Sequence, residues 1–405
     1  MAKRNVTMQP MRRVKGQTKS RKTPTAASPV TRVSRDIAAP TRIVLFVRAG
    51  GRCEFDGCNR YLLEHHLTLK EGNFAQMAHI VAFSKDGPRG KGKRRSQAIN
   101  SIDNLMLLCQ PCHKLIDDDP QTYPVPVLEG YKRQHEERIH HLTGLGPDLK
   151  TTIVQLCSRI AGQTVAIPLP QMMKAITPRY PIDKKGYVID LTAFDNEGAD
   201  FMSAAQREIE QRMARLYDNG MDLAQTHHIS LFAMAPIPLL IFLGSRLSSK
   251  VEVDLFQRHR DTEDWTWKTG GNAVEYVIEK QREGTDISKV ALLLSLSGKI
   301  SPASLPAEID GRFTVYELTL AHGQPTPTFL RTRGDLASFK QAYQTGLRTI
   351  GAVHAQPQAM SIFPAVPAPI AVLCGRERLP KVDPKFMVYD YDKRRGGFTF
   401  SLEVN

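Results

Sequence analysis

The chain has 405 residues, a hydrophobic fraction of 41% and a formal net charge of +14. This length allows two or three domains with packed cores. No uninterrupted apolar run reaches the roughly 18 residues of a membrane-spanning helix, and the basic N-terminus lacks the apolar segment of a secretory signal. We therefore expect no membrane segment, and the positive charge favours a polyanionic partner, most simply nucleic acid.

Residues 1–40 are rich in Thr, Ser, Pro, Lys and Arg and show no apolar period. Such a composition cannot bury a core, so we predict a disordered basic arm. A contact with DNA and a solvated tail without a role are both compatible with this segment.

Residues 41–145 show a pattern of short apolar segments separated by polar loops. We predict a short helix or strand at 41–50, a strand at 73–83, a Gly- and Lys-rich loop at 84–95, a second strand at 102–108, a helix starting at 112–118 and a polar helix at 128–142. On this last helix, His135 and Glu136 are expected on a solvated face. The composition changes near residues 144–147, where we place a domain boundary followed by a linker at 146–175.

Four of the six cysteines form two close pairs, Cys53-x4-Cys58 and Cys109-x2-Cys112. Two short turns that each supply a pair of thiolates are typical of a tetrahedral Zn²⁺ site, and four cysteines close the coordination sphere, so the zinc is expected to be structural. A secreted disulfide framework would lack this paired spacing. The pattern therefore also predicts a reducing, cytoplasmic environment.

Three further residues lie within or beside the cysteine frame: His79, Asn104 and His113. The string AHI…IDNLMLLCxxCH resembles the HNH, or ββα-metal, endonucleases over about residues 50–140. The resemblance implies an α+β HNH domain at 41–145 that hydrolyses phosphodiester bonds with a divalent ion, Mg²⁺ or Mn²⁺. It assigns His79 as the general base, Asn104 as the residue that braces the loop and orients His79, and His113 as a ligand of the divalent ion.

Many members of this family carry Asp or His immediately before the base, where this sequence has Ala78. Alanine cannot coordinate a metal, so another group must complete the metal shell. Asp117 lies one helical turn after His113 on the same helix face and is predicted as a second ligand. Gln76 and a water molecule are the alternatives.

The loop between the two predicted strands carries many cations next to a phosphate-cleaving site. Such side chains bind the DNA backbone and position it without reading sequence, so we expect cleavage of double-stranded DNA with little sequence specificity. The predicted DNA-binding residues are Lys85, Arg89, Lys91, Lys93, Arg94 and Arg95.

After residue 150 the sequence alternates between apolar and helical segments, which predicts an α/β domain with a mostly parallel sheet. We predict strands at residues 187–191, 228–235, 238–243, 251–257, 290–297, 314–320, 361–367, 370–374 and 386–391, and helices at 199–219, 273–283 and 334–350.

This half also contains an internal repeat. The segment SLFAMAPIP from Ser230 resembles SIFPAVPAP from Ser361, and both reach a glycine, Gly244 and Gly375, at the same spacing. We infer a duplication that produces two Rossmann-like halves related by a pseudo-two-fold axis.

Two segments of this half have features of a nucleotide site. Ser297, Gly298 and Lys299 follow an apolar strand and offer backbone amides and an amine to phosphate; an ordinary strand terminus is the alternative. Trp265, Trp267 and Lys268 are suited to stacking a base beside a cation, or the tryptophans pack in the core. Arg246 and Arg376 complete the predicted ligand-binding set.

The segments 230–244, 292–300 and 364–369 together resemble the SAVED domain, a fused pair of CARF-like Rossmann halves that binds cyclic oligonucleotides. We place this domain at 176–405. An HNH nuclease followed by a SAVED domain resembles the effectors of CBASS antiphage systems. The resemblance implies activation by a cyclic di- or trinucleotide, assembly into a homo-oligomer, dimer to tetramer, and destruction of DNA during abortive infection.

Two other functions remain open from the sequence. A modification-dependent HNH restriction endonuclease would use residues 150–405 to read methylated DNA. A zinc-dependent DNA-binding protein with a decayed HNH motif is the second alternative, and Ala78 gives it some weight.

Overall fold

The computed structural model describes residues 35–91, 99–160, 163–164, 167–183, 185–194, 200–218, 228–354 and 357–405. The predicted basic arm up to residue 34 and the loop cations Lys93, Arg94 and Arg95 lie outside these residues. The chain divides into two compact units, Met1–Thr143 and Gly144–Asn405. In the described part of the chain, no helix is long and apolar enough to cross a membrane.

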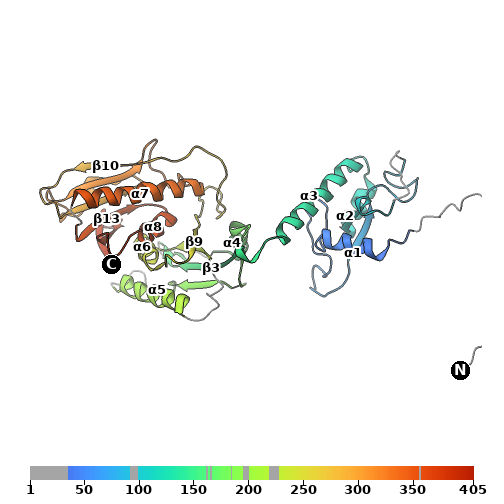
Figure 1. The fold of residues 1–405 in the computed structure, drawn as a ribbon, viewed down its shortest axis with the longest axis horizontal. Helices are drawn as coiled ribbons and strands as arrows, with labels where there is room; N and C mark the ends of the chain where they lie inside the picture. Colours follow the sequence, from blue (N-terminus) through green and yellow to red (C-terminus); the bar gives the residue numbers. More distant parts are fainter. Residues whose placement is uncertain are drawn as a thin grey trace, which may run out of the picture. The chain divides into compact units, whose positions relative to one another are not determined.

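The N-terminal unit is built around a β-hairpin followed by a helix (Figure 1). Strand β1 (Ala75–His79) pairs antiparallel with β2 (Leu105–Cys109), so that Ala75 faces Cys109 and His79 faces Leu105. All five residues of β2 are buried. The helices in the described part of this unit are α1 (Ala39–Arg48), α2 (Gln110–Asp118) and α3 (Val125–Thr143).

Sequence and structure differ in detail in this unit. The segment that could have been helix or strand is helix α1, which begins next to Pro40 and buries Leu45. The predicted second strand begins three residues late, because Ile102–Asn104 form the 3-10 turn η1. His135, expected on a solvated face, is buried, and its Nε2 lies 3.0 Å from the carbonyl oxygen of Ala49.

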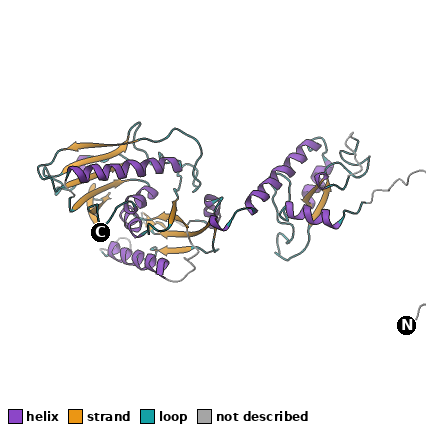
Figure 2. Ribbon diagram, in the orientation of Figure 1, coloured by secondary structure: helices purple, strands orange, loops and turns teal. Residues whose placement is uncertain are grey.

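The described part of the C-terminal unit contains two larger sheets, and helices lie between some of their successive strands along the chain (Figure 2). In the first sheet every pairing is parallel, and β3 is central. It pairs with β6, β7 and β8, and β8 pairs with β9. The strands are β3 (Lys150–Cys157), β6 (Tyr180–Pro181), β7 (Tyr187–Asp190), β8 (His228–Met234) and β9 (Glu252–Leu255).

The second sheet has six strands in the order β10-β12-β11-β13-β14-β15. The four central strands are parallel, and both edge strands are antiparallel to their neighbours. The bounds are β10 (Tyr276–Arg282), β11 (Val290–Ser295), β12 (Thr314–Leu320), β13 (Ala359–Ala365), β14 (Lys385–Asp392) and β15 (Gly397–Val404). The prediction of an α/β unit with mostly parallel sheets is confirmed.

The remaining elements of this unit are short strands and helices. They comprise the pair β4 (Arg159–Ile160) and β5 (Gln163–Thr164), the 3-10 turns η2 (Pro147–Leu149) and η3 (Pro302–Ser304), and the helices α4 (Leu169–Ile176), α5 (Phe201–Asp218), α6 (Ile237–Arg246), α7 (Arg333–Val353) and α8 (Ala368–Arg376).

Four predictions for the C-terminal half are wrong. Residues 238–243 and 370–374, expected as strands, are the buried helices α6 and α8. A short apolar run that is buried on all sides has no periodicity to separate helix from strand. Residues 273–283, expected as a helix, contain the edge strand β10 instead, because pairing with β12 overrides a helix-favouring composition. The expected linker at 146–175 contains β3, the central strand of the first sheet.

The repeated segments occupy equivalent positions. Each consists of a buried strand, a Pro-containing turn and a buried helix: β8 with α6, and β13 with α8. The two helices cross at their glycines. A Cβ on Gly244 would lie 1.9 Å from the carbonyl oxygen of Val372, and a Cβ on Gly375 would lie 1.8 Å from that of Ile241. This reciprocal contact is what a local two-fold axis between the halves produces.

Candidate functional site

The four paired cysteines converge in the N-terminal unit. Their sulfur atoms all lie within 4.8 Å of one another, and the Sγ atoms of Cys58 and Cys109 are 3.9 Å apart. A tetrahedral ion with Zn–S bonds of about 2.3 Å separates its ligand sulfurs by about 3.8 Å. Burial raises the pKa of Cys53 to about 12 and also raises that of Cys112, so a bound cation would favour the ionised form of these two thiols. The residues therefore fit a structural Zn²⁺.

His79 is the last residue of β1, next to the start of β2. Its Nε2 lies 2.9 Å from Oδ1 of Asn100, and its ring contacts Phe83 edge to face. Because an amide oxygen only accepts hydrogen bonds, this contact places the proton on Nε2 and leaves Nδ1 free to accept one. In this tautomer, Nδ1 is the nitrogen that can act as a general base.

The sequence predicted that Asn104 would orient His79, but Asn100 makes the contact with the ring. The Asn104 side chain accepts from the amide of Val81 at 2.8 Å and donates to the carbonyls of Val81 and Ile99 at 3.0 and 2.8 Å. Asn104 therefore braces the loop that follows β1. Nothing in the spacing of Asn100 distinguished it from other loop asparagines, since only the turn before β2 brings it to His79.

His113 and Asp117 lie one turn apart on α2 and are partly exposed. The Nε2 of His113 is 3.4 Å from Oδ2 of Asp117, and Oδ1 of Asp117 is 3.0 Å from Nη2 of Arg89. A nitrogen and a carboxylate oxygen at this separation are compatible with adjacent positions on one divalent ion. Within the described ranges, the cysteine cluster is the only group of three or more converging metal-ligand side chains, so the pair would bind an ion together with water or substrate oxygens.

The predicted DNA-binding cations of the loop differ in their surroundings. Lys85 and Lys91 are exposed. Arg89 is not available to DNA, because its side chain is only 4% exposed and its guanidinium donates to protein acceptors. The prediction for Arg89 is corrected: a positively charged loop does not reveal from its sequence which cations point inward.

A buried charge network connects α3 to the cysteine frame, and the sequence did not predict it. The Glu54 carboxylate accepts a hydrogen bond from the amide of Leu107 in β2 and lies 3.9 Å from the Lys132 amine, which also binds Glu136. Burial raises the pKa of Glu54 to about 7. The network fixes α3 against β2.

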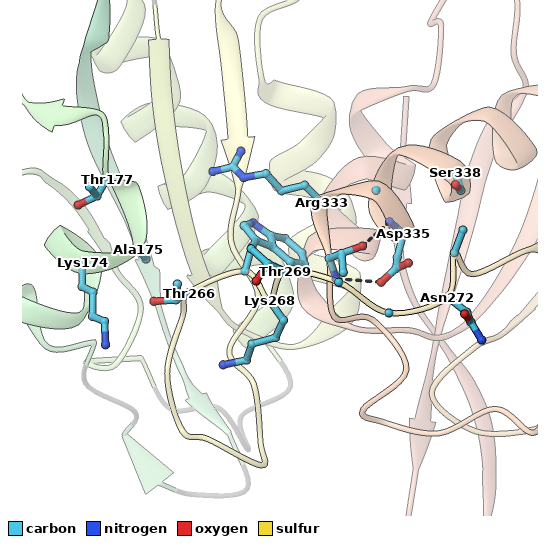
Figure 3. Close-up of a pocket in the computed structure, with 16 residues that line it drawn as sticks. Lys174, Ala175, Thr177, Thr266, Lys268, Thr269, Asn272, Arg333, Asp335 and Ser338 are labelled. Atoms are coloured by element: carbon cyan, nitrogen blue, oxygen red, sulfur yellow. Dashed lines mark hydrogen bonds between the residues drawn. The ribbon is translucent and has the colours of Figure 1, made fainter. Parts of the chain in front are cut away.

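The C-terminal unit contains a cavity of about 540 Å³, within the usual range for small-molecule sites. Three segments form its wall (Figure 3): the end of α4, the loop after Trp265 and the N-terminus of α7. Gly270 and Gly271 in that loop have positive φ angles, and no atom lies within 4 Å of where their Cβ atoms would be. Lining residues include Lys174, Thr177, Thr266, Trp267, Lys268, Thr269, Asn272, Thr332, Arg333, Asp335 and Ser338.

Three cations give this cavity a positive wall: Lys174, Lys268 and Arg333. The Lys268 amine is bound to both oxygens of Asp264, and Arg333 reaches Asp254 at 2.7 Å. Asp335 is engaged within α7, because it accepts from the amide of Thr332 in a capping box. Two of the three cations are therefore paired with carboxylates, and all three lie among polar lining side chains.

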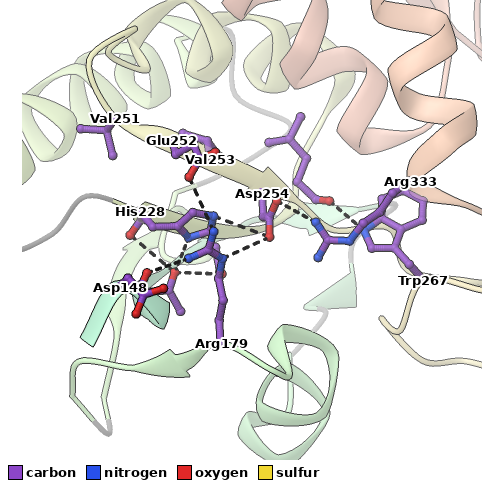
Figure 4. A network of polar contacts seen from close by, with 12 residues as sticks. Asp148, Arg179, His228, Val251, Glu252, Val253, Asp254, Trp267 and Arg333 are labelled. Atoms are coloured by element: carbon purple, nitrogen blue, oxygen red, sulfur yellow. Dashed lines mark hydrogen bonds and ion pairs between the residues drawn. The ribbon is translucent and has the colours of Figure 1, made fainter. Parts of the chain in front are cut away.

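Asp254 also joins Arg333 to a second set of charges (Figure 4). Its Oδ2 lies 3.6 Å from Nε2 of His228 and 3.8 Å from Nε of Arg179. Arg179 continues to the backbone carbonyl of Asp148 in η2 at 3.3 Å. The cavity wall is thus connected by polar contacts to the first turn of the C-terminal unit.

Most of the predicted ligand residues lie elsewhere. Trp265 is 2% exposed and packs against Phe232 in the core, so its stacking role is corrected. Trp267 is largely buried and donates to the carbonyl of Leu255, although its edge lines the cavity. Lys268 lines the cavity. Of the other five predicted residues, Arg376 lines a separate smaller cavity, and Ser297, Gly298, Lys299 and Arg246 are outside both described linings.

These five residues make other contacts or lie at another place in the unit. Arg246 pairs with Glu210, and Arg376 donates to the carbonyls of Val251 and Val253. Ser297, Gly298 and Lys299 follow β11 at its carboxyl end, where the Ser297 amide donates to Ala365. The cavity was missed because its wall is assembled from three segments far apart in sequence.

Comparison with protein families identifies both units. Residues 53–119 match the model of the HNH endonuclease family, and residues 213–404 match that of the SAVED family, described as the SMODS-associated sensor domain fused to various effectors. No curated protein sequence matches the chain.

Among solved structures, the chain is similar to the Cap4 SAVED/CARF-domain receptor of Acinetobacter baumannii with the cyclic trinucleotide 2'3'3'-cAAA, at 12% identity and a TM-score of 0.43, over 76% of this chain and 64% of that one. The corresponding receptor of Moraxella osloensis matches at 11% identity and a TM-score of 0.39, over 72% of this chain and 60% of that one. The chain thus spans less than two thirds of these two receptors.

The chain therefore carries an HNH endonuclease-family domain and a SAVED-family sensor domain.

Proposed function

We propose that the chain is a metal-dependent endonuclease that degrades double-stranded DNA with little sequence specificity when a cyclic di- or trinucleotide binds its SAVED domain, and that it acts as a CBASS antiphage effector. The observation that carries the proposal is the combination, in one chain, of an HNH domain with a sensor domain that holds a cation-lined cavity. The receptor from Acinetobacter baumannii with a bound cyclic trinucleotide supports the ligand class.

At the nuclease site, the attacking water loses its proton to Nδ1 of His79, whose other nitrogen is held by Asn100. A divalent ion, Mg²⁺ or Mn²⁺, would stabilise the charge that develops on the scissile phosphate. His113 and Asp117 would hold that ion, and Lys85 and Lys91, with Lys93, Arg94 and Arg95, would hold the DNA backbone.

At the sensor site, the cavity between α4, the 266–273 loop and α7 is proposed to hold the cyclic nucleotide in place of the site first predicted at 297–299. Lys174, Lys268 and Arg333 would contact phosphates, and the edge of Trp267 would contact a base. Ligand-promoted assembly of a dimer to tetramer would bring nuclease domains together on one duplex.

The test is a plasmid-degradation assay with the full chain, Mg²⁺ or Mn²⁺ and a panel of cyclic di- and trinucleotides. His79→Ala is the inactive control and should retain zinc. We expect cleavage with one class of cyclic nucleotide and little cleavage without it. Cleavage that ignores every nucleotide but requires cytosine methylation would establish a modification-dependent restriction endonuclease instead, and a wild type that never cuts would establish a DNA-binding protein.

A further inference from the structure

The loop after β1 is tightly folded around an arginine. The amide of Gly87 donates to Ser84, the amide of Gly90 donates to Gly87, and the amide of Ala82 donates to Pro88. A Cβ on Gly90 would lie 2.4 Å from the carbonyl oxygen of Ser84, so the turn has no room for a side chain there. Arg89 itself has a φ angle of +58°, a left-handed conformation that is unfavourable for a residue with a Cβ.

The strained backbone directs the Arg89 side chain into the domain. Its Nε donates to the carbonyl of Ile80 at 2.7 Å, directly after His79 at the end of β1. Its Nη1 donates to the carbonyl of Ile116 in α2, and its Nη2 donates to Asp117 at 3.0 Å. One guanidinium thus joins the residue after the general base to the helix that carries the metal-binding pair.

These contacts use the particular geometry of an arginine side chain. A guanidinium has five donors in a fixed plane and can reach several acceptors at once, whereas a lysine amine is a single point of charge. Asp117 has two oxygens, and Arg89 occupies Oδ1 while Oδ2 faces His113. The orientation of Asp117 toward His113 is therefore set from the loop.

We propose that Arg89 is a positioning residue for DNA hydrolysis, which fixes the spacing between the His79 base and the His113–Asp117 pair rather than contacting DNA. The proposal rests on the roles proposed above for these three residues. Because small displacements of reacting groups are costly, loss of Arg89 should reduce kcat by about 100-fold, and it should weaken binding of the divalent ion because Asp117 is no longer held.

The experiment compares Arg89→Lys, Arg89→Ala and the matched control Lys91→Ala in the full chain. Lys91 is an exposed cation of the same loop, two residues away. Cleavage is measured at saturating activator over a range of DNA and salt concentrations. Mn²⁺ binding to the zinc-loaded protein is measured by electron paramagnetic resonance without DNA, and zinc content and thermal unfolding report the fold.

The expected pattern separates positioning from DNA contact. Both Arg89 variants should lose kcat with little change in KM and should bind Mn²⁺ more weakly, while retaining zinc. Millimolar guanidinium chloride should partly restore Arg89→Ala, and the same concentration of sodium chloride should not. Lys91→Ala should instead raise KM and reduce the salt dependence of binding.

Two results would overturn the inference. One is an Arg89→Lys variant with the wild-type kcat and Mn²⁺ affinity. The other is a pair of Arg89 variants that, like Lys91→Ala, change only KM and its salt dependence. If Arg89→Ala does not fold, Arg89→Lys decides between these outcomes. If the wild type never cuts DNA, the proposed function fails, whereas the Mn²⁺ measurement still tests whether Arg89 supports the metal-binding pair.

Discussion

The crossing of α6 and α8 gives the most quantitative prediction from the fold. In Gly244→Ala, the new Cβ would lie 1.9 Å from the backbone oxygen of Val372, whereas ordinary contacts begin at 3.4 Å. The obstacle is helix backbone, so a side-chain rotation cannot relieve it. The crossing segments of both helices are fully buried, which leaves no free space to take up the displacement of about 1.5 Å.

We expect Gly244→Ala and Gly375→Ala each to lower the free energy of unfolding of the C-terminal unit by about 3 kcal/mol or more, the upper range for overpacking. The matched control is Gly351→Ala in α7, where no atom lies within 4 Å of the new Cβ. This control should leave stability unchanged or raise it by up to about 1 kcal/mol, because alanine favours helix.

The assay is denaturant unfolding followed by tryptophan fluorescence. Both tryptophans of the chain, Trp265 and Trp267, lie in the C-terminal unit, so the signal reports that unit alone. The double variant Gly244→Ala/Gly375→Ala should lower the free energy of unfolding by less than the sum of the two single variants, because one separation of the helices relieves both contacts. A Gly244→Ala midpoint equal to that of Gly351→Ala would refute the close crossing.

Four further predictions concern the two sites. Cys112→Ser should lose zinc and unfold the N-terminal unit while the tryptophan unfolding curve stays in place, as zinc analysis and fluorescence would show. Asn100→Ala should lower kcat by about tenfold or more, with DNA affinity unchanged, because His79 loses its tautomer partner; an unchanged pH–rate profile would argue against this role. Arg333→Met should weaken cyclic-nucleotide binding by about tenfold in calorimetry, whereas Arg348→Met on the exposed side of α7 should not. Burial lowers the pKa of His228, and the nearby Asp254 carboxylate partly offsets this shift. The neutral ring therefore contributes stability that is present above the unfolded-state pKa of about 6.5 and is lost as the pH falls below it. His228→Gln should therefore flatten the acid side of the stability profile of the C-terminal unit.

At the candidate nuclease site, residue spacing in the sequence predicted most of the residues that come together. The cysteine pairs, His79, Asn104 and His113 are close in sequence to the elements that carry them, and one hairpin and one helix bring them together. Local geometry of this kind is encoded in residue spacing. Asn100 and Arg89 were different, because the direction of a loop side chain depends on the backbone conformation of its turn, and a charge pattern does not specify it.

In the C-terminal unit, the features that the sequence determined differ clearly from those that only the tertiary structure decided. Its sequence determined an α/β unit with parallel strands and an internal repeat, because the alternation of segments and the repeated segment are both visible in the amino-acid sequence. The tertiary structure decided that the two repeated apolar runs are helices, that residues 150–157 form a central strand, and that α4, the 266–273 loop and α7 meet around one cavity. Each of these depends on contacts between segments distant in sequence, whose burial and hydrogen bonding outweigh the weak local preferences of short apolar or polar runs.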